Sequence, residues 1–404
     1  MNKVQRLLLG IIVALCLFIF YFKTYPLRDS ELISYIRSPL ETISEPITHI
    51  PVDITLLIVD LKYNEKQGVK ICEIQPGSLS VFNGIDYIHD GYGLVPKMFC
   101  KFIKHFQTLG WFVFHDISDN KFKDILLEKG WSTEESLETM LQNPFFVSLA
   151  RTPVKDPHNL ADYHGVLWAR QWKTMSMEDF RNNFPGIILI DGAVFPYKGD
   201  KFKMSHLLTT DERLIKLKPM WNAYPKVFSQ ELVQQIVQDI PSNILVIKPM
   251  KSTRGNGVII IQKDDLEPTL KYILTEDKVT LDNNPDPSYN HWGHDHCNGF
   301  IVEEFIESDP VRAPHLDNNL YDPTMRVVFA LIYHQKKMNV VFFEGNWKLP
   351  KISLSEPGTL TEKHRSYGHD SNFLSVEPHL LHKIEDQLRE PLTVLYQQML
   401  ETSH

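Results

Sequence analysis

The first apolar stretch of the chain, Leu7–Phe22, contains no charged residue and no Asn, Gln, Ser or Thr. As a helix this stretch would span about 24 Å, slightly less than the ~30 Å hydrocarbon core of a bilayer. Lys23 and Arg28 can lengthen the span by reaching toward the interface. Because the bulky residues at its end offer no small-residue cleavage site, we predict an uncleaved transmembrane helix rather than a cleaved signal peptide.

Shorter apolar runs follow, and their spacing is typical of strands. Ile54–Leu61 and Val69–Ile74 are β-like runs separated by a polar, turn-like segment. In the middle of the chain, the strand-like runs Trp111–His115, Phe145–Leu149 and Ile187–Ile190 alternate with helical stretches. This alternation predicts an α/β unit.

From Asp200 onward the pattern becomes α+β. Five further runs predict strands, at Ile244–Lys248, Val258–Ile261, Phe300–Phe305, Met325–Ile332 and Asn339–Phe343. The chain ends on an amphipathic pattern over residues 380–399, which predicts a helix.

Composition limits the class of protein. The 404 residues include 43% hydrophobic and 23% charged residues, which excludes a disordered chain and a multi-pass membrane protein. The net charge of −8 argues against a general nucleic-acid-binding protein, which needs a basic surface. Four cysteines are too few for a disulfide scaffold.

The strongest local motif is a Gly-rich hairpin, Ile244–Ile261. Its first strand carries Lys248, and the loop that follows, residues 252–257, contains Ser252, Thr253, Gly255 and Gly257. Glycines allow backbone N–H groups to approach phosphate oxygens, hydroxyls add donors, and the lysine adds a positive charge. An ordinary β-hairpin with a glycine turn is the alternative interpretation.

Three further pieces surround this hairpin in the sequence. Lys201 precedes a predicted helix, in Gly-Asp-Lys. Glu303 and Glu304 stand side by side in an apolar strand, where two carboxylates need a reason to be buried. Arg326 begins the strand after Asp322-Pro-Thr-Met.

In this order and spacing, the four pieces resemble the ATP-grasp superfamily, which includes D-alanine–D-alanine ligase and biotin carboxylase. The resemblance covers roughly residues 187–350. It implies an α+β fold with two lobes that hold ATP between two antiparallel sheets. With the preceding segments, it predicts an anchor at 1–30, a tether and strand pair at 31–85, an α/β domain at 86–198 and the ATP-grasp lobes at 199–404.

The resemblance also implies roles for individual residues. Lys201 and Lys248 would bind the ATP phosphates, and the Gly-rich loop would close over them. Glu303, Glu304 and Ile306 would form the hinge that meets the adenine. Arg326 would face the γ-phosphate and the acylphosphate, so that Arg326 and Lys248 are the expected catalytic residues.

The metal ligands depart from the family pattern. The family ends with an Asp and then Glu-x-Asn, which hold Mg²⁺ through the oxygen ligands that this ion prefers. Here Glu344-Gly-Asn346 matches by letter but comes early, and nothing equivalent follows it. Near the beginning of the chain, Asp60, Glu73 and Gln75 stand on a strand–turn–strand segment.

We therefore hypothesise a circular permutation, in which the family's last strands come first and Asp60, Glu73 and Gln75 hold the metal. Glu344 and Asn346 stay open as the other metal pair, and Asp60 and Glu73 could be ordinary hairpin acids. A separate cluster, His291–Cys297, has the residue types of a metal site. It lies in a polar insertion, so we favour solvated or substrate-contacting histidines.

The implied function is that of a membrane-anchored ATP-dependent ligase with ATP and Mg²⁺ as cofactors. A carboxylate substrate (an amino acid, a peptide or a protein tail) would be activated as an acylphosphate and attacked by an amine. A phosphotransferase on the same fold and a non-catalytic ATP-binding scaffold are the alternatives. Because a ligase needs abundant ATP, we expect the globular part on the cytosolic side of the membrane, attached through residues 7–22.

Overall fold

A computed structural model describes residues 50–76, 88, 137–169, 177–190, 192–252, 255–367 and 372–403, together with the backbone at 111–114 and 131–134. All of these belong to one unit, Glu41–His404. The predicted membrane anchor and most of the tether lie outside the described residues. Within the part of the chain that is described, no helix is long and apolar enough to cross a membrane.

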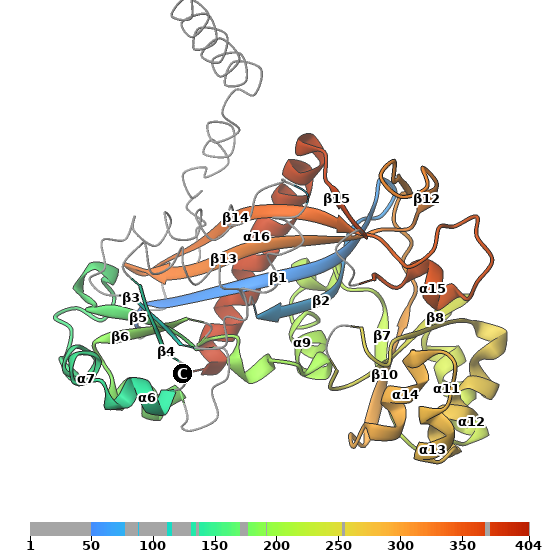
Figure 1. The fold of residues 1–404 in the computed structure, drawn as a ribbon, viewed down its shortest axis with the longest axis horizontal. Coiled ribbons are helices and arrows are strands. Elements are labelled where there is room, and N and C mark those ends of the chain that lie inside the picture. Colours follow the sequence, from blue (N-terminus) through green and yellow to red (C-terminus); the bar gives the residue numbers. More distant parts are fainter. Residues whose placement is uncertain are drawn as a thin grey trace, which may run out of the picture. The chain divides into compact units, whose positions relative to one another are not determined.

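The elements are labelled as in Figure 1. The strands are β1 (Asp53–Asn64), β2 (Gly68–Pro76), β3 (Trp111–Phe114), β4 (Trp131–Glu134), β5 (Gly165–Ala169), β6 (Ile187–Ile190), β7 (Trp221–Pro225), β8 (Ile244–Pro249), β9 (Ile259–Gln262), β10 (Gly299–Glu304), β11 (Val311–Arg312), β12 (Leu320–Tyr321), β13 (Thr324–His334), β14 (Lys337–Lys348) and β15 (Phe373–Ser375). The helices are α6 (Leu137–Gln142), α7 (Pro144–Arg151), α8 (Met177–Asn183), α9 (Lys201–Leu207), α10 (Glu212–Ile215), α11 (Gln230–Asp239), α12 (Leu266–Thr275), α13 (Lys278–Asp282), α14 (Pro287–Asn290), α15 (Leu360–His364) and α16 (Pro378–Ser403). Short 3₁₀ turns are η2 (Leu160–Asp162), η3 (Phe195–Tyr197), η4 (Lys263–Asp265) and η5 (His291–His294).

A large mixed sheet joins the beginning, the middle and the end of the chain. Its strand order is β15-β14-β13-β1-β6-β5-β3-β4, with β2 also paired to β1. Strands β3 to β6 are parallel to one another, whereas β1 pairs antiparallel with β13 along most of its length. Strand β1 is therefore the junction between the parallel and the antiparallel part of the sheet (Figure 1).

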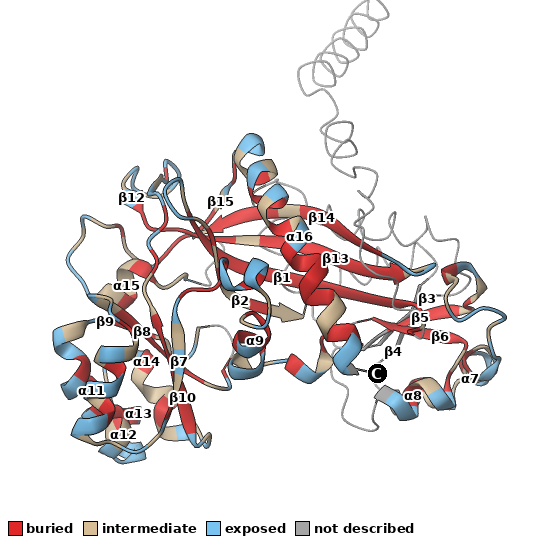
Figure 2. Ribbon diagram, turned by 180° about the vertical axis from the view of Figure 1, so that it is seen from behind, coloured by how far each residue is buried: buried red, intermediate tan, exposed pale blue. Residues whose placement is uncertain are grey.

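One face of the antiparallel part packs against α16. Val59 of β1 and Val327 of β13 lie in the same hydrophobic core as Leu388 and Leu395 of the helix. The apolar residues of α16 recur every three or four positions, at Leu381, Ile384, Leu388, Leu392, Leu395 and Met399. Figure 2 shows α16 lying across these buried strands. Because successive side chains of a strand point to opposite faces, the residues between these apolar positions face away from α16.

The smaller sheet is antiparallel, with the order β7-β10-β8-β9. Its core contains Leu245 and Ile247 of β8 with Ile236 of α11 and Leu270 of α12. The hairpin β8–β9 contains the Gly-rich loop. Lys248 and the Gly-rich loop therefore belong to a sheet whose hydrophobic core is separate from that of the large sheet.

The predicted strands of the C-terminal half are confirmed, as are the pair that became β1 and β2 and the helix that became α16. The predicted strand Phe145–Leu149 is wrong, because this segment forms α7. Pro144 occupies the first turn, and Asn143 caps the helix by accepting hydrogen bonds from the N–H groups of Phe145 and Phe146. These start signals outweigh the β propensity of the phenylalanine pair. The domain boundary expected at residue 198 stays a prediction. The large sheet contains strands from both sides of this residue.

Candidate functional site

A row of polar side chains crosses the large sheet on the face away from α16. The register pairs Glu73 with Asp60, Asp60 with Arg326, and Arg326 with Asn346. Residues in register on neighbouring strands share a face, so these four side chains form one line, which we call the polar row. The row joins residues that are up to 286 positions apart in the sequence, from 60 to 346.

The centre of the polar row is an ion pair. Arg326 donates from Nε and Nη2 to the two oxygens of Asp60, at 2.7 and 2.8 Å, and Lys348 Nζ lies 3.4 Å from Oδ2. Burial alone would raise the pKa of Asp60. Arg326 and Lys348 outweigh this effect and lower the pKa to about 2. Asp60 is therefore ionised, and its bidentate contact fixes the guanidinium of Arg326.

Lys201 links the polar row to the Gly-rich loop. It is the first residue of α9, which Asp200 caps by accepting from Lys203 N–H. Its Nζ lies 3.3 Å from Glu73 Oε1 and donates to the carbonyl and hydroxyl oxygens of Ser252, the latter at 3.0 Å. The first expected phosphate-binding lysine thus lies between a predicted metal ligand and the beginning of the loop.

Lys248 belongs to a buried cluster of three charges. Glu303 accepts from Lys248 Nζ and from Lys218 Nζ, each at 2.5 Å. Burial opposes the charge of Glu303, but the two lysines lower its pKa below the usual value. With one carboxylate between two ammonium groups, the cluster carries an excess of positive charge, which favours an anion nearby.

The same cluster touches the strand pair at the beginning of the chain. Lys248 Nζ also donates to the carbonyl oxygen of Cys72, at 3.3 Å. Cys72 is the extra residue of a bulge in β2, where the register shifts after Asp60 and Glu73. The small sheet therefore contacts the β1–β2 hairpin next to the polar row. Sequence reasoning missed Lys218, since it stands in a short segment without a motif.

The expected hinge residues differ in their partners. Glu303 faces the lysines, as described above. Glu304 is engaged at both ends, because its N–H donates to Met220 O and its carboxylate accepts from Met220 N–H, each at 2.8 Å. Ile306 is buried, and no described group accepts a hydrogen bond from its backbone N–H. Of the three, Ile306 is the residue with a backbone donor to offer a ligand.

The Gly-rich loop has two glycines with positive φ, Gly255 at +71° and Gly257 at +74°. An added Cβ at Gly257 would stand 2.5 Å from Pro249 and 2.8 Å from His291, so only glycine fits there. Trp292 Nε1 donates to Gly257 O at 3.0 Å. Thr253 lies outside the described residues.

The two metal-ligand pairs left open by the sequence lie on either side of Arg326. Asp60 and Glu73 are neighbours on β1 and β2, and Gln75 is two residues further along the same face. Glu344 and Asn346 occupy the same face of β14. Within the described ranges, no group of three or more His, Cys, Asp or Glu side chains is arranged to hold a metal ion. The sequence-predicted set accordingly offers two carboxylates and an amide.

Oxygen acceptors on the β14 side are poorly solvated. Among the residues that the structure describes, none donates a hydrogen bond to the buried Oδ1 of Asn346. Burial raises the pKa of Glu344 to about 7, despite a hydrogen bond from Gly345 N–H that lowers it. A buried acceptor without a donor is costly unless a ligand supplies one.

The histidine insertion packs against the Gly-rich loop. His291 lies beside Gly257, and burial lowers its pKa below the usual value. His294 instead pairs with Asp282 at 2.8 Å in an exposed position. The two histidines thus have separate surroundings and different partners.

Comparison with protein-family models gave no match, and comparison with curated proteins gave none at the significance required. Among solved structures, the chain is similar to the biotin carboxylase domain of 2-oxoglutarate carboxylase from Hydrogenobacter thermophilus, in complex with MgADP, ADP and bicarbonate. The identity is 11% and the TM-score 0.30, over 65% of this chain and 62% of that one, so the match spans less than two thirds of the domain.

Two other solved structures show a similar degree of likeness. D-alanine–D-alanine ligase from Coxiella burnetii is 9% identical with a TM-score of 0.29, over 73% of this chain and 98% of that one. D-cycloserine synthetase DcsG is 12% identical with a TM-score of 0.28, over 70% and 99%. All three are ATP-grasp enzymes, and the likeness concerns the fold alone.

Proposed function

We propose that this protein is an ATP-dependent ligase of the ATP-grasp type, which activates a carboxylate as an acylphosphate for attack by an amine. One observation carries the proposal. Lys201 and Lys248, which lie on different elements, both meet the β1–β2 hairpin next to the Asp60–Arg326 pair. The cations that we propose for phosphate binding and the carboxylates come from four distant parts of the sequence.

The arrangement suits phosphoryl transfer, which needs charge neutralisation rather than a protein nucleophile. Lys201 and Lys248 would hold the phosphates of ATP, and the N–H of Ile306 would bind the adenine edge. Arg326, held by Asp60, would stabilise the charge that develops on the transferring γ-phosphoryl group. The substrate carboxylate oxygen would attack phosphorus as ADP leaves, and the amine would then displace phosphate from the acyl carbon.

Oxygen atoms on β1 and β2, at one end of the polar row, would suit Mg²⁺. This ion commonly uses one or two carboxylates together with substrate phosphates and water. Asp60 and Glu73 supply two adjacent carboxylates, and Gln75 supplies an amide oxygen on the same face. When bound with ATP, the ion would neutralise phosphate charge. The nearby cations Lys201, Arg326 and Lys348 favour arrival of the metal together with the nucleotide, since they repel a free cation.

The test uses Lys248→Ala, with the exposed Lys271→Ala of α12 as the matched control. ADP release from MgATP is measured with panels of carboxylates and amines, and hydroxylamine traps any acylphosphate. We expect Lys248→Ala to abolish turnover while circular dichroism stays unchanged, because Glu303 keeps Lys218 as a partner. Lys271→Ala should turn over normally.

Full turnover in Lys248→Ala would reject the assignment. A stable phosphorylated product, with no ligated one, would identify a phosphotransferase. Nucleotide binding without ADP release across the panels would identify a non-catalytic scaffold.

Membrane attachment through residues 7–22 is part of the proposal, and the uncharged sequence of that segment supports it. The globular part would then lie on the cytosolic side, where ATP is abundant.

A further inference from the structure

The chain between β14 and β15 contacts both sheets. It leaves the large sheet at Lys348 and returns at Phe373, where β15 pairs with β14. Tyr367 N–H donates to Leu349 O at 2.9 Å, which closes the base of the segment. Helix α15 lies at its far end, beside the small sheet (Figure 1).

Helix α15 is fixed to the edge strand of the small sheet. Thr361 donates its hydroxyl to Ile260 O at 3.3 Å and accepts from Ile260 N–H at 2.9 Å, satisfying both backbone groups of that residue. Thr359 and Glu362 form a capping box that defines the start of the helix. The helix therefore has a set position relative to β9 and the Gly-rich loop.

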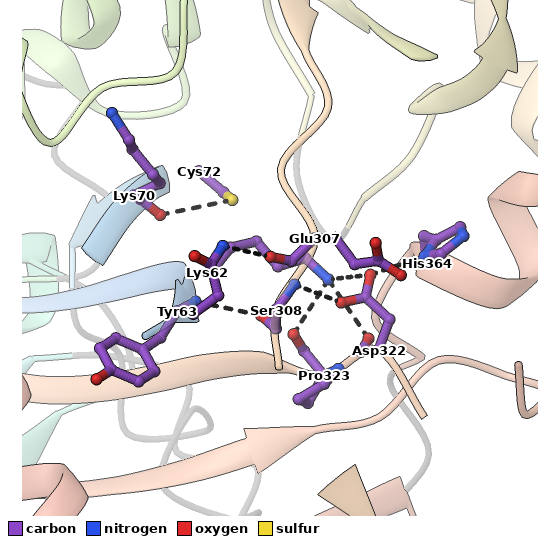
Figure 3. Close-up of polar contacts among 10 residues, drawn as sticks. Lys62, Tyr63, Lys70, Cys72, Glu307, Ser308, Asp322, Pro323 and His364 are labelled. Carbon is purple, nitrogen blue, oxygen red and sulfur yellow. Dashed lines mark hydrogen bonds and ion pairs between the residues drawn. The ribbon is translucent and has the colours of Figure 1, made fainter. Parts of the chain in front are cut away.

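A buried network also fixes α15 to the large sheet. Asp322, which is fully buried, contacts His364 Nδ1 and Lys62 Nζ, each at 2.7 Å. Its other oxygen accepts from the N–H of Ser308 at 2.7 Å. Figure 3 shows Lys62 of β1, the segment after β10 with Ser308, and His364 of α15 meeting at Asp322, which lies just before β13.

Arg365, the residue after α15, binds the backbone of the Gly-rich loop. Its Nη1 lies 3.5 Å from Gly255 O and 3.4 Å from Val258 O, and it donates to Ser288 Oγ at 2.5 Å. Its Cδ would stand 3.5 Å from a Cβ at Gly255, so the side chain lies directly along the loop. The carboxylates of Asp286 and Glu362 act on Arg365 electrostatically, but neither forms an ion pair with it within the described residues.

We propose that Arg365 is a positioning residue that holds the Gly255–Val258 backbone in place for nucleotide phosphates. The inference rests on the proposed function for its ligand, but the restraint on the loop is a property of the protein alone. The guanidinium suits the task because Nη1, which makes all three contacts, is held in a rigid planar group, whereas an ammonium is a point donor on a flexible stem.

The experiment compares Arg365→Ala and Arg365→Lys with Lys351→Ala, which removes an exposed lysine from the same segment. Amide hydrogen exchange is measured over residues 255–258 in the nucleotide-free full chain, and dissociation constants are measured for ATP and for adenosine. We expect Arg365→Ala to exchange about tenfold faster there and to bind ATP about tenfold more weakly, a change of about 1.4 kcal/mol. Adenosine, which has no phosphates, should bind equally well to the wild type and to Arg365→Ala.

Arg365→Lys should fall between the wild type and Arg365→Ala, and Lys351→Ala should match the wild type. Unchanged exchange in a folded Arg365→Ala protein would overturn the proposal. An equal loss of ATP and adenosine affinity would also overturn it, because the effect would then not concern the phosphates. If the wild type binds no ATP, the proposed function fails, while the exchange measurement still decides the role of Arg365.

Discussion

At the scale of single residues, the carboxylate of Asp60 has two roles, one expected from the sequence and one seen in the structure. The sequence predicts a metal ligand, and the structure places both oxygens against Arg326. The two are compatible, because a carboxylate has about four lone-pair directions, and Arg326 and Lys348 together occupy three of them. The sequence could not reveal this contact, since the partners are separated by 266 positions.

The pH dependence of stability tests the Asp60 pair. The pKa of Asp60 is lowered from 3.8 to about 2 in the fold, so its contribution is fully present above pH ~4 and is lost as the pH falls toward 2. A shift of this size corresponds to about 2 kcal/mol. We expect the free energy of unfolding of wild type to exceed that of Asp60→Asn at pH 5, with the difference shrinking through this window. Urea unfolding at stepped pH measures it, and a constant difference would contradict the pair.

At the scale of elements, hydrophobic pattern predicted most of the strands that build the site. The alternation in β13 and β14 follows from one face packing on α16, and helix α16 shows the matching period. The pattern failed at Phe145–Leu149, where capping by Asn143 and the proline at the first turn decide for a helix. The hydrophobic pattern also could not identify Lys218 as a site residue, because its contact with Glu303 depends on the tertiary structure.

Helix α16 should contribute strongly to the stability of the fold, because it packs on the face of β1 and β13 opposite to the polar row. Leu388 is fully buried in the core shared with β1 and β13. Leu388→Ala should lower the free energy of unfolding by about 2–5 kcal/mol, because it removes apolar contacts and leaves a cavity. Chemical denaturation measures the loss, with the exposed Lys383→Ala as control. A change below about 0.5 kcal/mol would show that the helix does not pack on the sheet as described.

At the scale of the whole molecule, β1 and β2 lie beside candidate site residues that come much later in the sequence. Strand β1 pairs with β13 in register, which places Asp60 opposite Arg326. The spacing of Asp60 and Glu73 predicts a circular permutation, which stays a prediction, and the structure places both residues beside Arg326 and Lys201. The register itself could not be predicted, because pairing between distant strands depends on the packing of the complete sheet.

A structure of the protein with a non-hydrolysable ATP analogue and Mg²⁺ tests the central proposal most directly. The account predicts the triphosphate between Lys201, Lys248 and Arg326, with the metal on Asp60 and Glu73 and the adenine against Ile306. A nucleotide bound away from these lysines, or a metal held only by Glu344 and Asn346, would contradict it.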